Sequence, residues 1–261
     1  MPMNFNLEKK LKKQGYQIII GVDEAGRGPL CGPVVAAATL CRISNFQFPI
    51  SKQKDLNLIR DSKKLSEKQR EGLFDFIHEN FYVGVGICDH KIIDRINILQ
   101  ASLLAMKKAV NNLLKTNNFQ FSISNFQSNP NDQKFKNTKH QIQNTKYQIP
   151  DTKCIILIDG NKVIPNLSCE QRTIVGGDRK VKSIAAASIV AKVTRDRLMQ
   201  KMDKKYPQYE FAKHKGYGTK LHMERLKKFG PSLIHRLSFR PVREAASLPK
   251  RVFDVKLREE K

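Results

Sequence analysis

Residues 17–29 read QIIIGVDEAGRGP, and this stretch decides the fold class. Its isoleucine run is β-branched and typical of a buried strand, and the run ends in two adjacent acids, Asp23 and Glu24. The loop that follows is dense in glycine and proline, which indicates that the strand stops there. We therefore expect a buried strand that presents carboxylates at its end.

Outward from this stretch, strand-like and helix-like patterns alternate along the chain. We expect further strands at residues 34–40, 81–88, 154–158 and 172–175, and helices at 67–79, 98–115 and 183–202. Short helical segments broken by glycine and proline fill the chain beyond the last of these. Because strands and helices interleave, the pattern predicts an α/β fold.

One segment, residues 116–151, does not share this alternation. It is rich in Asn, Gln, Lys and Ser and has no sustained hydrophobic period. A low-complexity insert in a surface loop is the simplest interpretation, and a contact with a polyanion through its lysines is the alternative. We expect the main domain to span residues 17–203, with this insert inside it, and a helical C-terminal subdomain with a tail to span 204–261.

The chain is strongly basic. Its 261 residues contain 48 Lys+Arg against 24 Asp+Glu, a formal net charge of +24, which favours nucleic acid or an anionic membrane as partner. The sequence has no run of about 18 apolar residues and no start that resembles a signal peptide, so we expect a cytoplasmic protein that does not bind membranes. The five cysteines are scattered without a C-x-x-C pair, which argues against a disulfide framework or a structural zinc site.

Two further acids occupy comparable positions. Asp159 directly follows the fourth expected strand. Asp196 lies about three turns along a helix face that begins with the small residues Ala185 and Ser188, which would let the helix pack closely on a sheet. Taken singly, each signal has a simpler interpretation, because an Asp-Glu pair can begin a turn and Asp196 can pair with Lys192 on its own helix.

Together, Asp23, Glu24, Asp159 and Asp196 are four carboxylates without a cluster of His or Cys. Such hard oxygen ligands favour Mg²⁺ or Mn²⁺ over zinc. In a basic protein the corresponding chemistry is hydrolysis of a phosphodiester, with two ions about 3.5–4 Å apart that activate the water and stabilise the leaving oxygen. The cations are needed because the acids alone would repel an anionic phosphate.

Six short motifs occur in order along the chain. They are DEAGRGP at 23–29, DSKKLS at 61–66, IDGN at 158–161, IAAASIVAKVTRD at 184–196, HKGYGT with the later His222 at 214–222, and HR with SF at 235–239. This ordered set resembles ribonuclease HII and covers most of residues 17–241. The resemblance implies a ribonuclease H-like fold, in which helices flank a mixed sheet, with a helical C-terminal subdomain.

By position, the resemblance implies that Asp23, Glu24, Asp159 and Asp196 are the catalytic acids and bind the metal. The implied activity is endonucleolytic cleavage of RNA paired with DNA, including a single ribonucleotide embedded in duplex DNA, which leaves 3′-OH and 5′-phosphate ends. The implied partners are therefore RNA/DNA hybrids and ribonucleotide-containing DNA, and we expect the enzyme to be a monomer.

Seven other residues are implied to contact the substrate. They are Gly26, Arg27 and Gly28 in the loop that recognises the ribonucleotide, Tyr217 beside its 2′-OH, and Ser62, Lys63 and Lys64 near the phosphates. Glycines let a backbone approach a sugar closely, and a site that distinguishes RNA from DNA must sense the 2′-OH. Without the resemblance, Tyr217 could equally be a turn tyrosine, and the two lysines would be read as solvated surface charges.

Two alternatives to this assignment remain open. The sister family ribonuclease HIII has an N-terminal substrate-binding domain, for which the 16 residues before the first strand leave no room. A basic nucleic-acid-binding protein without catalysis would explain the charge but not the positions of the acids. The insert and the chain after Val242 have no counterpart in the family pattern. That tail lacks a Gln-led, aromatic-ended segment, so no sliding-clamp partner is inferred.

Overall fold

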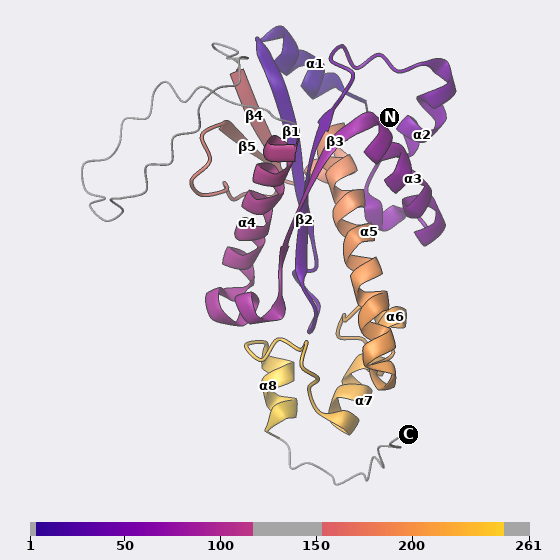
Figure 1. Cartoon of the computed structure of the whole chain (residues 1–261), viewed down its shortest axis with the longest axis vertical. Coiled ribbons are helices and arrows are strands. Elements are labelled where there is room, and N and C mark those ends of the chain that lie inside the picture. Colours follow the sequence, from indigo (N-terminus) through magenta and orange to yellow (C-terminus); the bar gives the residue numbers. More distant parts are fainter. Residues whose placement is uncertain (1–3, 117–152, 248–261) are drawn as a thin grey trace, which may run out of the picture.

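The computed structural model describes residues 4–116 and 153–247 (Figure 1). Most of the segment predicted as an insert and the end of the C-terminal tail lie outside the described residues. The described part contains a five-stranded sheet with helices on both faces, and further short helices lie beyond one end of the sheet. The predicted α/β fold, a mixed sheet flanked by helices, is confirmed.

The sheet is mixed because its central strand pairs differently on its two sides. β1 (Tyr16–Ala25) is antiparallel to β2 (Val34–Cys41), which is antiparallel to β3 (Phe81–Cys88). On its other side β1 is parallel to β4 (Lys153–Asp159), and β4 is parallel to β5 (Glu170–Ile174). The order β3-β2-β1-β4-β5 puts the strand that ends in the two acids at the centre.

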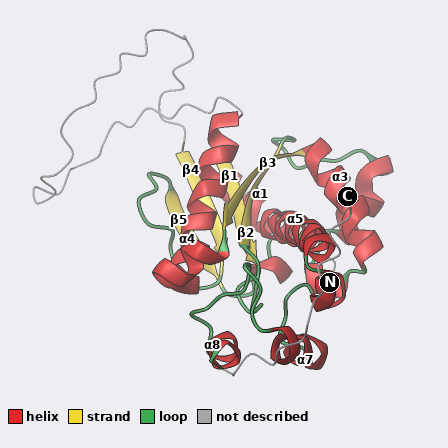
Figure 2. Ribbon diagram, turned by 60° about the horizontal axis from the view of Figure 1, so that its bottom comes forward, coloured by secondary structure: helices red, strands yellow, loops and turns green. Residues whose placement is uncertain are grey.

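Two long helices cover opposite faces of the sheet (Figures 1 and 2). α4 (His90–Thr116) packs on β3 and β2, and α5 (Lys182–Lys205) packs on β1 and β2. Both helices approach the sheet closely because strand glycines lie at the contacts. A Cβ atom on Gly86 would lie 2.0 Å from a carbonyl oxygen of α4, and one on Gly21 would lie 2.3 Å from the Ser183 carbonyl carbon of α5.

α4 contains a break at Asn97, where φ is 66°. The Asn97 side chain accepts a hydrogen bond from the Gln100 amide at 3.1 Å and so caps the helix that continues from there. For this reason the hydrophobic period in the sequence begins at residue 98, although the helical segment starts at His90.

The remaining helices are shorter. On the N-terminal side they are α1 (Asn6–Lys13), α2 (Gln53–Leu58) and α3 (Glu67–Asn80). Beyond the end of the sheet they are α6 (Phe211–His214), α7 (Lys220–Phe229) and α8 (Arg240–Ala246). No helix in these described parts is long and apolar enough to cross a membrane. Because α5 runs on to Lys205, the expected division of domains after residue 203 falls in its last turn, and that division stays a prediction.

Candidate active site

Strand alternation directs Asp23 and Asp159 to the same face of the sheet. Asp23 is paired with Ala37 of β2, which packs in the core cluster on the α5 side. In β4, Ile158 is paired with Val22 of β1, and both pack on the opposite, α4 side. Because successive residues of a strand point to opposite faces, Asp159 points to the α5 side beside Asp23.

Glu24 starts from the other face of the sheet. Its partner in β2 is Ala36, which packs in the cluster on the α4 side. The Glu24 side chain is 11% exposed and forms an ion pair with Arg27 at 3.3 Å. The two adjacent acids are therefore divided between the faces, and Glu24 lies where the strand ends and the exposed Arg27 begins the loop.

Asp196 lies on α5, and no described hydrogen bond or ion pair joins its side chain to Asp23, Glu24 or Asp159. Its buried carboxylate accepts a hydrogen bond from Lys192 Nζ at 2.8 Å, the pairing that the sequence also suggested. Two turns earlier on the same face of α5, Ser188 hydrogen-bonds the Asp23 carboxylate. The small residues of this helix therefore serve both close packing on β1 and direct contact with the first acid.

Burial and mutual repulsion act on these carboxylates. Burial holds the pKa of Asp23 well above its ordinary value, and the negative charges of Glu24 and Asp159 add to this effect. Hydrogen bonds from Ser188 and from the Glu24 amide, the latter at 2.7 Å, act in the opposite direction. Burial also raises the pKa of Glu24, against the effect of Arg27. Buried negative charge of this kind is stabilised when a cation shares it.

A divalent cation fits this donor set. Carboxylate oxygens are the ligands that Mg²⁺ and Mn²⁺ prefer, and a bound cation would favour the ionised form of Asp23. Among the residues that the structure describes, no three of the predicted acids have oxygens all within 4.8 Å of one another. Shared coordination would therefore require the side chains to converge, and the metal-binding role of the four acids stays a prediction.

Two acids outside the predicted site residues, Asp178 and Asp61, lie near the predicted site. Asp178 and Asp61 are both buried, and burial together with the charges of Asp159 and Asp61 raises the pKa of Asp178. The neighbouring Gly177 amide donates to Asp159 Oδ1 at 2.6 Å and so fixes the predicted catalytic acid. Asp159 ends β4, whereas Asp178 lies in the turn Gly177–Arg179 after β5, so the position of Asp178 along the chain was only a weak signal.

The predicted recognition loop adopts a conformation that needs glycine at its first position. Gly26 has φ of 102°, and a Cβ atom there would lie 2.3 Å from Arg195 Nε. Arg27 is exposed apart from its pairing with Glu24. At Gly28 an added Cβ would lie 3.8 Å from Tyr217 Cε1, so the loop and the predicted 2′-OH contact are neighbours.

Tyr217 joins the loop to the acids. Its side chain is 43% exposed, and both Lys192 Nζ and Arg195 Cζ lie 5.8 Å from its ring centre. Since Lys192 is also the partner of Asp196, the lysine lies close to both the tyrosine ring and the acid. Residues that are far apart in the sequence thus meet where the resemblance implied a bound ribonucleotide.

The three predicted site residues of the DSKKLS motif, Ser62, Lys63 and Lys64, differ in exposure. The motif forms a 3₁₀ turn at Ser62–Lys64, capped by Asp61, whose Oδ1 accepts from the Lys63 amide at 3.0 Å. Lys63 and Lys64 are exposed, as a phosphate contact requires. Ser62 is only 3% exposed, and its Oγ lies 2.9 Å from Ser188 Oγ, so the structure directs it to the interior behind Asp23.

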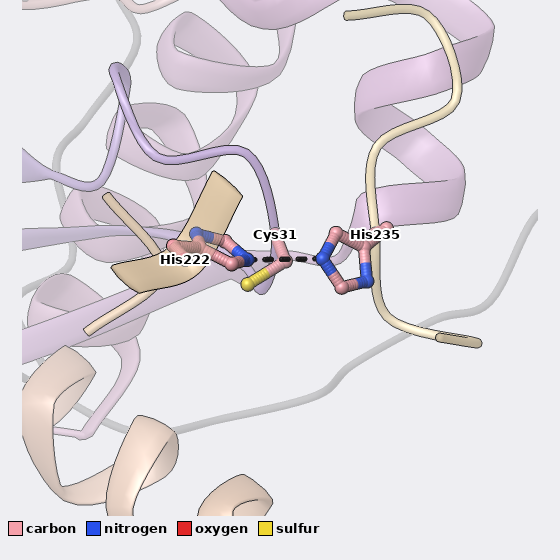
Figure 3. Close-up of side chains that lie close together, drawn as sticks. All are labelled: Cys31, His222 and His235. Carbon is pink, nitrogen blue, oxygen red and sulfur yellow. Dashed lines mark hydrogen bonds between the residues drawn. The ribbon is translucent and has the colours of Figure 1, made fainter. Parts of the chain in front are cut away.

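A separate buried group consists of Cys31, His222 and His235, whose ligand atoms all lie within 4.8 Å of one another (Figure 3). Hydrogen bonds determine which ring nitrogen of each histidine carries the proton. His222 Nδ1 donates to the Tyr217 carbonyl oxygen at 2.9 Å, whereas His235 Nδ1 accepts from the Ser232 amide at 2.9 Å. His235 therefore carries its proton on Nε2 and donates it to His222 Nε2 at 3.0 Å.

This proton makes the group a pair of neutral histidines and not a metal site. A metal on His235 Nε2 would require the proton to move to Nδ1, where the Ser232 N–H already points. Burial also raises the pKa of Cys31 to about 12, which disfavours the thiolate that metals bind. Burial lowers the pKa of His222 to about 4 and that of His235 to about 3, in keeping with neutral rings.

Comparison with known proteins agrees with the motifs. The family described as Ribonuclease HII matches residues 20–242. Ribonuclease HII of Caldicellulosiruptor bescii is 45% identical over 236 residues, which cover 90% of this chain and 92% of that protein. Ribonuclease HII of Endomicrobium trichonymphae is 43% identical over 247 residues, which cover 94% of this chain and 96% of that protein.

Solved structures share the fold. Ribonuclease H2 from Pyrococcus horikoshii OT3 has a TM-score of 0.56 at 25% identity, over 88% of this chain and 97% of that one. RNase HII of Archaeoglobus fulgidus, solved as a complex with PCNA, has a TM-score of 0.54 at 22% identity, over 81% and 88%. Bst-RNase HIII, solved with Mn²⁺, has a TM-score of 0.60 at 17% identity, over 90% and 72%, which shows the fold alone.

These matches decide between the two sister families. The solved ribonuclease HIII shows a shared fold at 17% identity, whereas the sequence matches to ribonuclease HII extend over nearly the whole chain. The chain therefore belongs to the ribonuclease HII family of metal-dependent ribonucleases H.

Proposed function

We propose that this chain is an endoribonuclease that cuts the RNA strand of RNA/DNA hybrids and single ribonucleotides embedded in duplex DNA. The observation that carries the proposal is that Asp23 and Asp159 point side by side toward α5, which itself contributes Asp196. Carboxylates on one face of the sheet, in a protein with a net charge of +24, suit a reaction at a phosphate of a polyanion.

The four predicted acids, Asp23, Glu24, Asp159 and Asp196, would hold Mg²⁺ or Mn²⁺, with two ions in the site. Bound ions of this kind supply an activated water and stabilise the leaving oxygen, which gives 3′-OH and 5′-phosphate ends. The protein's own part is to orient the ligands. Ser188 holds the Asp23 carboxylate, and the backbone after β5 holds Asp159.

Residues 26–28 and Tyr217 would distinguish RNA from DNA. The glycines allow the backbone to approach the ribose, and the exposed tyrosine ring beside Gly28 can contact the sugar while its hydroxyl meets the 2′-OH. Lys63 and Lys64 are exposed, the charge of Lys63 acts on Asp178, and both lysines would contact phosphates. Because Ser62 is buried, we propose for it a supporting role behind Asp23.

The proposed substrate suggests a biological role. Removal of ribonucleotides from duplex DNA would make this an enzyme of DNA replication and repair, and we propose that it acts in the cytoplasm. The complex of Archaeoglobus fulgidus RNase HII with PCNA makes a sliding clamp a candidate partner. The sequence of the chain after Val242 gives no inference of a clamp partner, and residues 248–261 of it lie outside the described residues.

The test uses a labelled duplex with one ribonucleotide, a long RNA/DNA hybrid and an all-DNA duplex of the same sequence. With Mg²⁺ or Mn²⁺ we expect one cut at the ribonucleotide, multiple cuts in the hybrid, no cut in DNA, and 3′-OH and 5′-phosphate ends. A chelator should abolish all cutting. Binding of the duplexes without cleavage under either ion would contradict the proposal and favour the non-catalytic alternative.

A further inference from the structure

The backbone of residues 26–33, which contains the proposed recognition loop, is held almost entirely from outside itself. Within it, the Leu30 amide donates to the Gly216 carbonyl at 2.8 Å and the Gly32 amide donates to the Ile234 carbonyl at 2.9 Å. Both partners belong to the chain beyond α5. The loop therefore depends on the C-terminal segment for its position.

Arg236 makes the densest set of these contacts. Its guanidinium is fully buried and donates to three carbonyl oxygens of the loop: Nη2 to Gly26 at 2.7 Å, Nη1 to Arg27 at 3.1 Å and Nε to Gly32 at 3.0 Å. Its own amide donates to the Leu30 carbonyl at 2.9 Å. One side chain thus spans both ends of the loop.

A second buried guanidinium completes the support from α5. Arg195 Nε donates to the Pro33 carbonyl at 3.0 Å and Nη2 donates to the Cys31 carbonyl at 3.3 Å. Among the described residues, neither Arg195 nor Arg236 forms an ion pair with an acid. A buried cation without an acidic partner is costly to place, and the contacts of these two guanidinium groups are with carbonyl oxygens and with the rings of Tyr217 and Phe239. Their hydrogen bonds therefore fix the backbone of the loop.

We propose that Arg236 is a positioning residue that sets the conformation of residues 26–28 and thereby the discrimination between ribose and deoxyribose. The planar guanidinium matches this role because it presents donors in fixed directions toward carbonyls at separate points of the loop. Lysine has one flexible ammonium group and cannot hold the three carbonyls of Gly26, Arg27 and Gly32 in one geometry. The consequence is that the C-terminal segment is part of substrate recognition.

The inference rests on the proposed function in one respect, the role of residues 26–28 in recognising the ribose. A single embedded ribonucleotide offers one 2′-OH and depends on the loop at that one position. A long hybrid offers a 2′-OH at every residue and tolerates imperfect placement. Displacement of the loop should therefore reduce cleavage at the single ribonucleotide more than cleavage of the hybrid.

The first experiment compares the wild type with Arg236→Lys on both substrates. We expect the ratio of kcat/KM for the single ribonucleotide to that for the hybrid to fall about tenfold, while the KM for the hybrid changes little. This ratio does not depend on the fraction of folded enzyme. Arg240→Gln is the matched control, because Arg240 lies in the same C-terminal segment with its side chain 81% exposed, and it should leave the ratio unchanged.

The second readout is hydrogen exchange and does not need activity. In Arg236→Lys the amides of Leu30 and Gly32 should exchange about tenfold faster, while amides in the middle of β1 keep their protection. If the wild type cleaves neither substrate, the proposed function fails but this exchange test stands. If the wild type cleaves and the variant keeps both the wild-type ratio and the wild-type exchange, the positioning role is overturned.

A second variant covers the case in which Arg236→Lys does not fold. Asp94 on α4 holds the turn after Arg236 from the surface, because it accepts from the Leu237 and Ser238 amides at 3.0 and 2.9 Å. Asp94→Ala should change the ratio and the exchange in the same direction, by about threefold. A folded Asp94→Ala protein with unchanged values of both would also overturn the inference.

Discussion

The hydroxyl oxygens of Ser62 and Ser188 lie 2.9 Å apart, and Ser188 also hydrogen-bonds the carboxylate of Asp23. The two serines come from the DSKKLS turn and from α5, so they connect two segments that are distant in the sequence to the first acid of the site. This contact lowers the pKa of a carboxylate that burial raises.

Removal of this hydrogen bond should weaken the binding of metal by Asp23. In Ser188→Ala the pKa of Asp23 rises further, so protons compete more strongly with the cation, and we expect the half-saturating Mg²⁺ concentration near neutral pH to rise about tenfold. The difference should shrink at higher pH. Mg²⁺ titrations of the cleavage rate at two pH values measure this effect.

Ser62→Ala is the control for that experiment, because it leaves the contact between Ser188 and Asp23 in place. It should shift the Mg²⁺ requirement less than Ser188→Ala does. Equal shifts in the two variants, or none in Ser188→Ala, would show that the serine does not act through Asp23.

Substitution of the predicted catalytic acids should reduce cleavage without reducing binding of the duplex. Asp23→Asn and Asp159→Asn remove a charged oxygen ligand from the proposed metal site, so we expect cleavage to fall by about 10³-fold or more. Binding of the duplex should persist or tighten, since the substitutions also remove negative charge. Cleavage rates measure the loss of activity, and gel-shift titrations measure the affinity for the duplex.

Asp75→Asn provides the matched control, because Asp75 lies exposed on α3 and should be neutral in both measurements. Normal cleavage by either Asp23→Asn or Asp159→Asn would exclude the assignment of that acid.

Tyr217 and Arg27 should affect recognition of the ribonucleotide more than general affinity. Tyr217→Phe removes only the hydroxyl, and Tyr217→Ala also removes the ring beside Gly28. We expect the hydroxyl to account for about tenfold in kcat/KM at a single ribonucleotide, in line with the loss of one specific hydrogen bond. Arg27→Ala should act similarly. If plain DNA binding weakens by the same factors, these side chains are general contacts with the backbone.

The neutral histidine pair should make stability depend on pH. The pKa of His222 is about 4 and that of His235 is about 3 in the folded protein, below the ordinary value of 6.5. At these two histidines the unfolded chain therefore binds more protons below about pH 6.5, so their contribution to stability is full above that pH and is lost as the pH falls toward 4. Each histidine contributes up to about 1.4 kcal/mol per pH unit in this window.

Urea unfolding at pH 7 and pH 5 measures this dependence. His235→Asn should remove part of the slope, whereas His78→Gln should keep it, because His78 is exposed. An identical slope in His235→Asn and in the wild type would contradict the proton assignment of the pair.

Much of the fold could be predicted because its signals are local. The isoleucine run of β1, the alternating residues of β3 and the small residues of α5 each carry their period within a few turns or pleats. The acids at the ends of β1 and β4 could be selected for the same reason. The expected elements do not include α1, whose Leu7 and Leu11 lie one turn apart on an otherwise polar eight-residue helix.

Order and spacing along the chain are enough to predict the strands, the main helices, the family and the candidate acids. The opposite faces from which Asp23 and Glu24 start, the inward direction of Ser62 and the hydrogen bonds of Arg236 to the recognition loop could be seen only in the folded chain. Burial and hydrogen bonding between distant segments depend on which surfaces meet, and no local period in the sequence specifies those contacts.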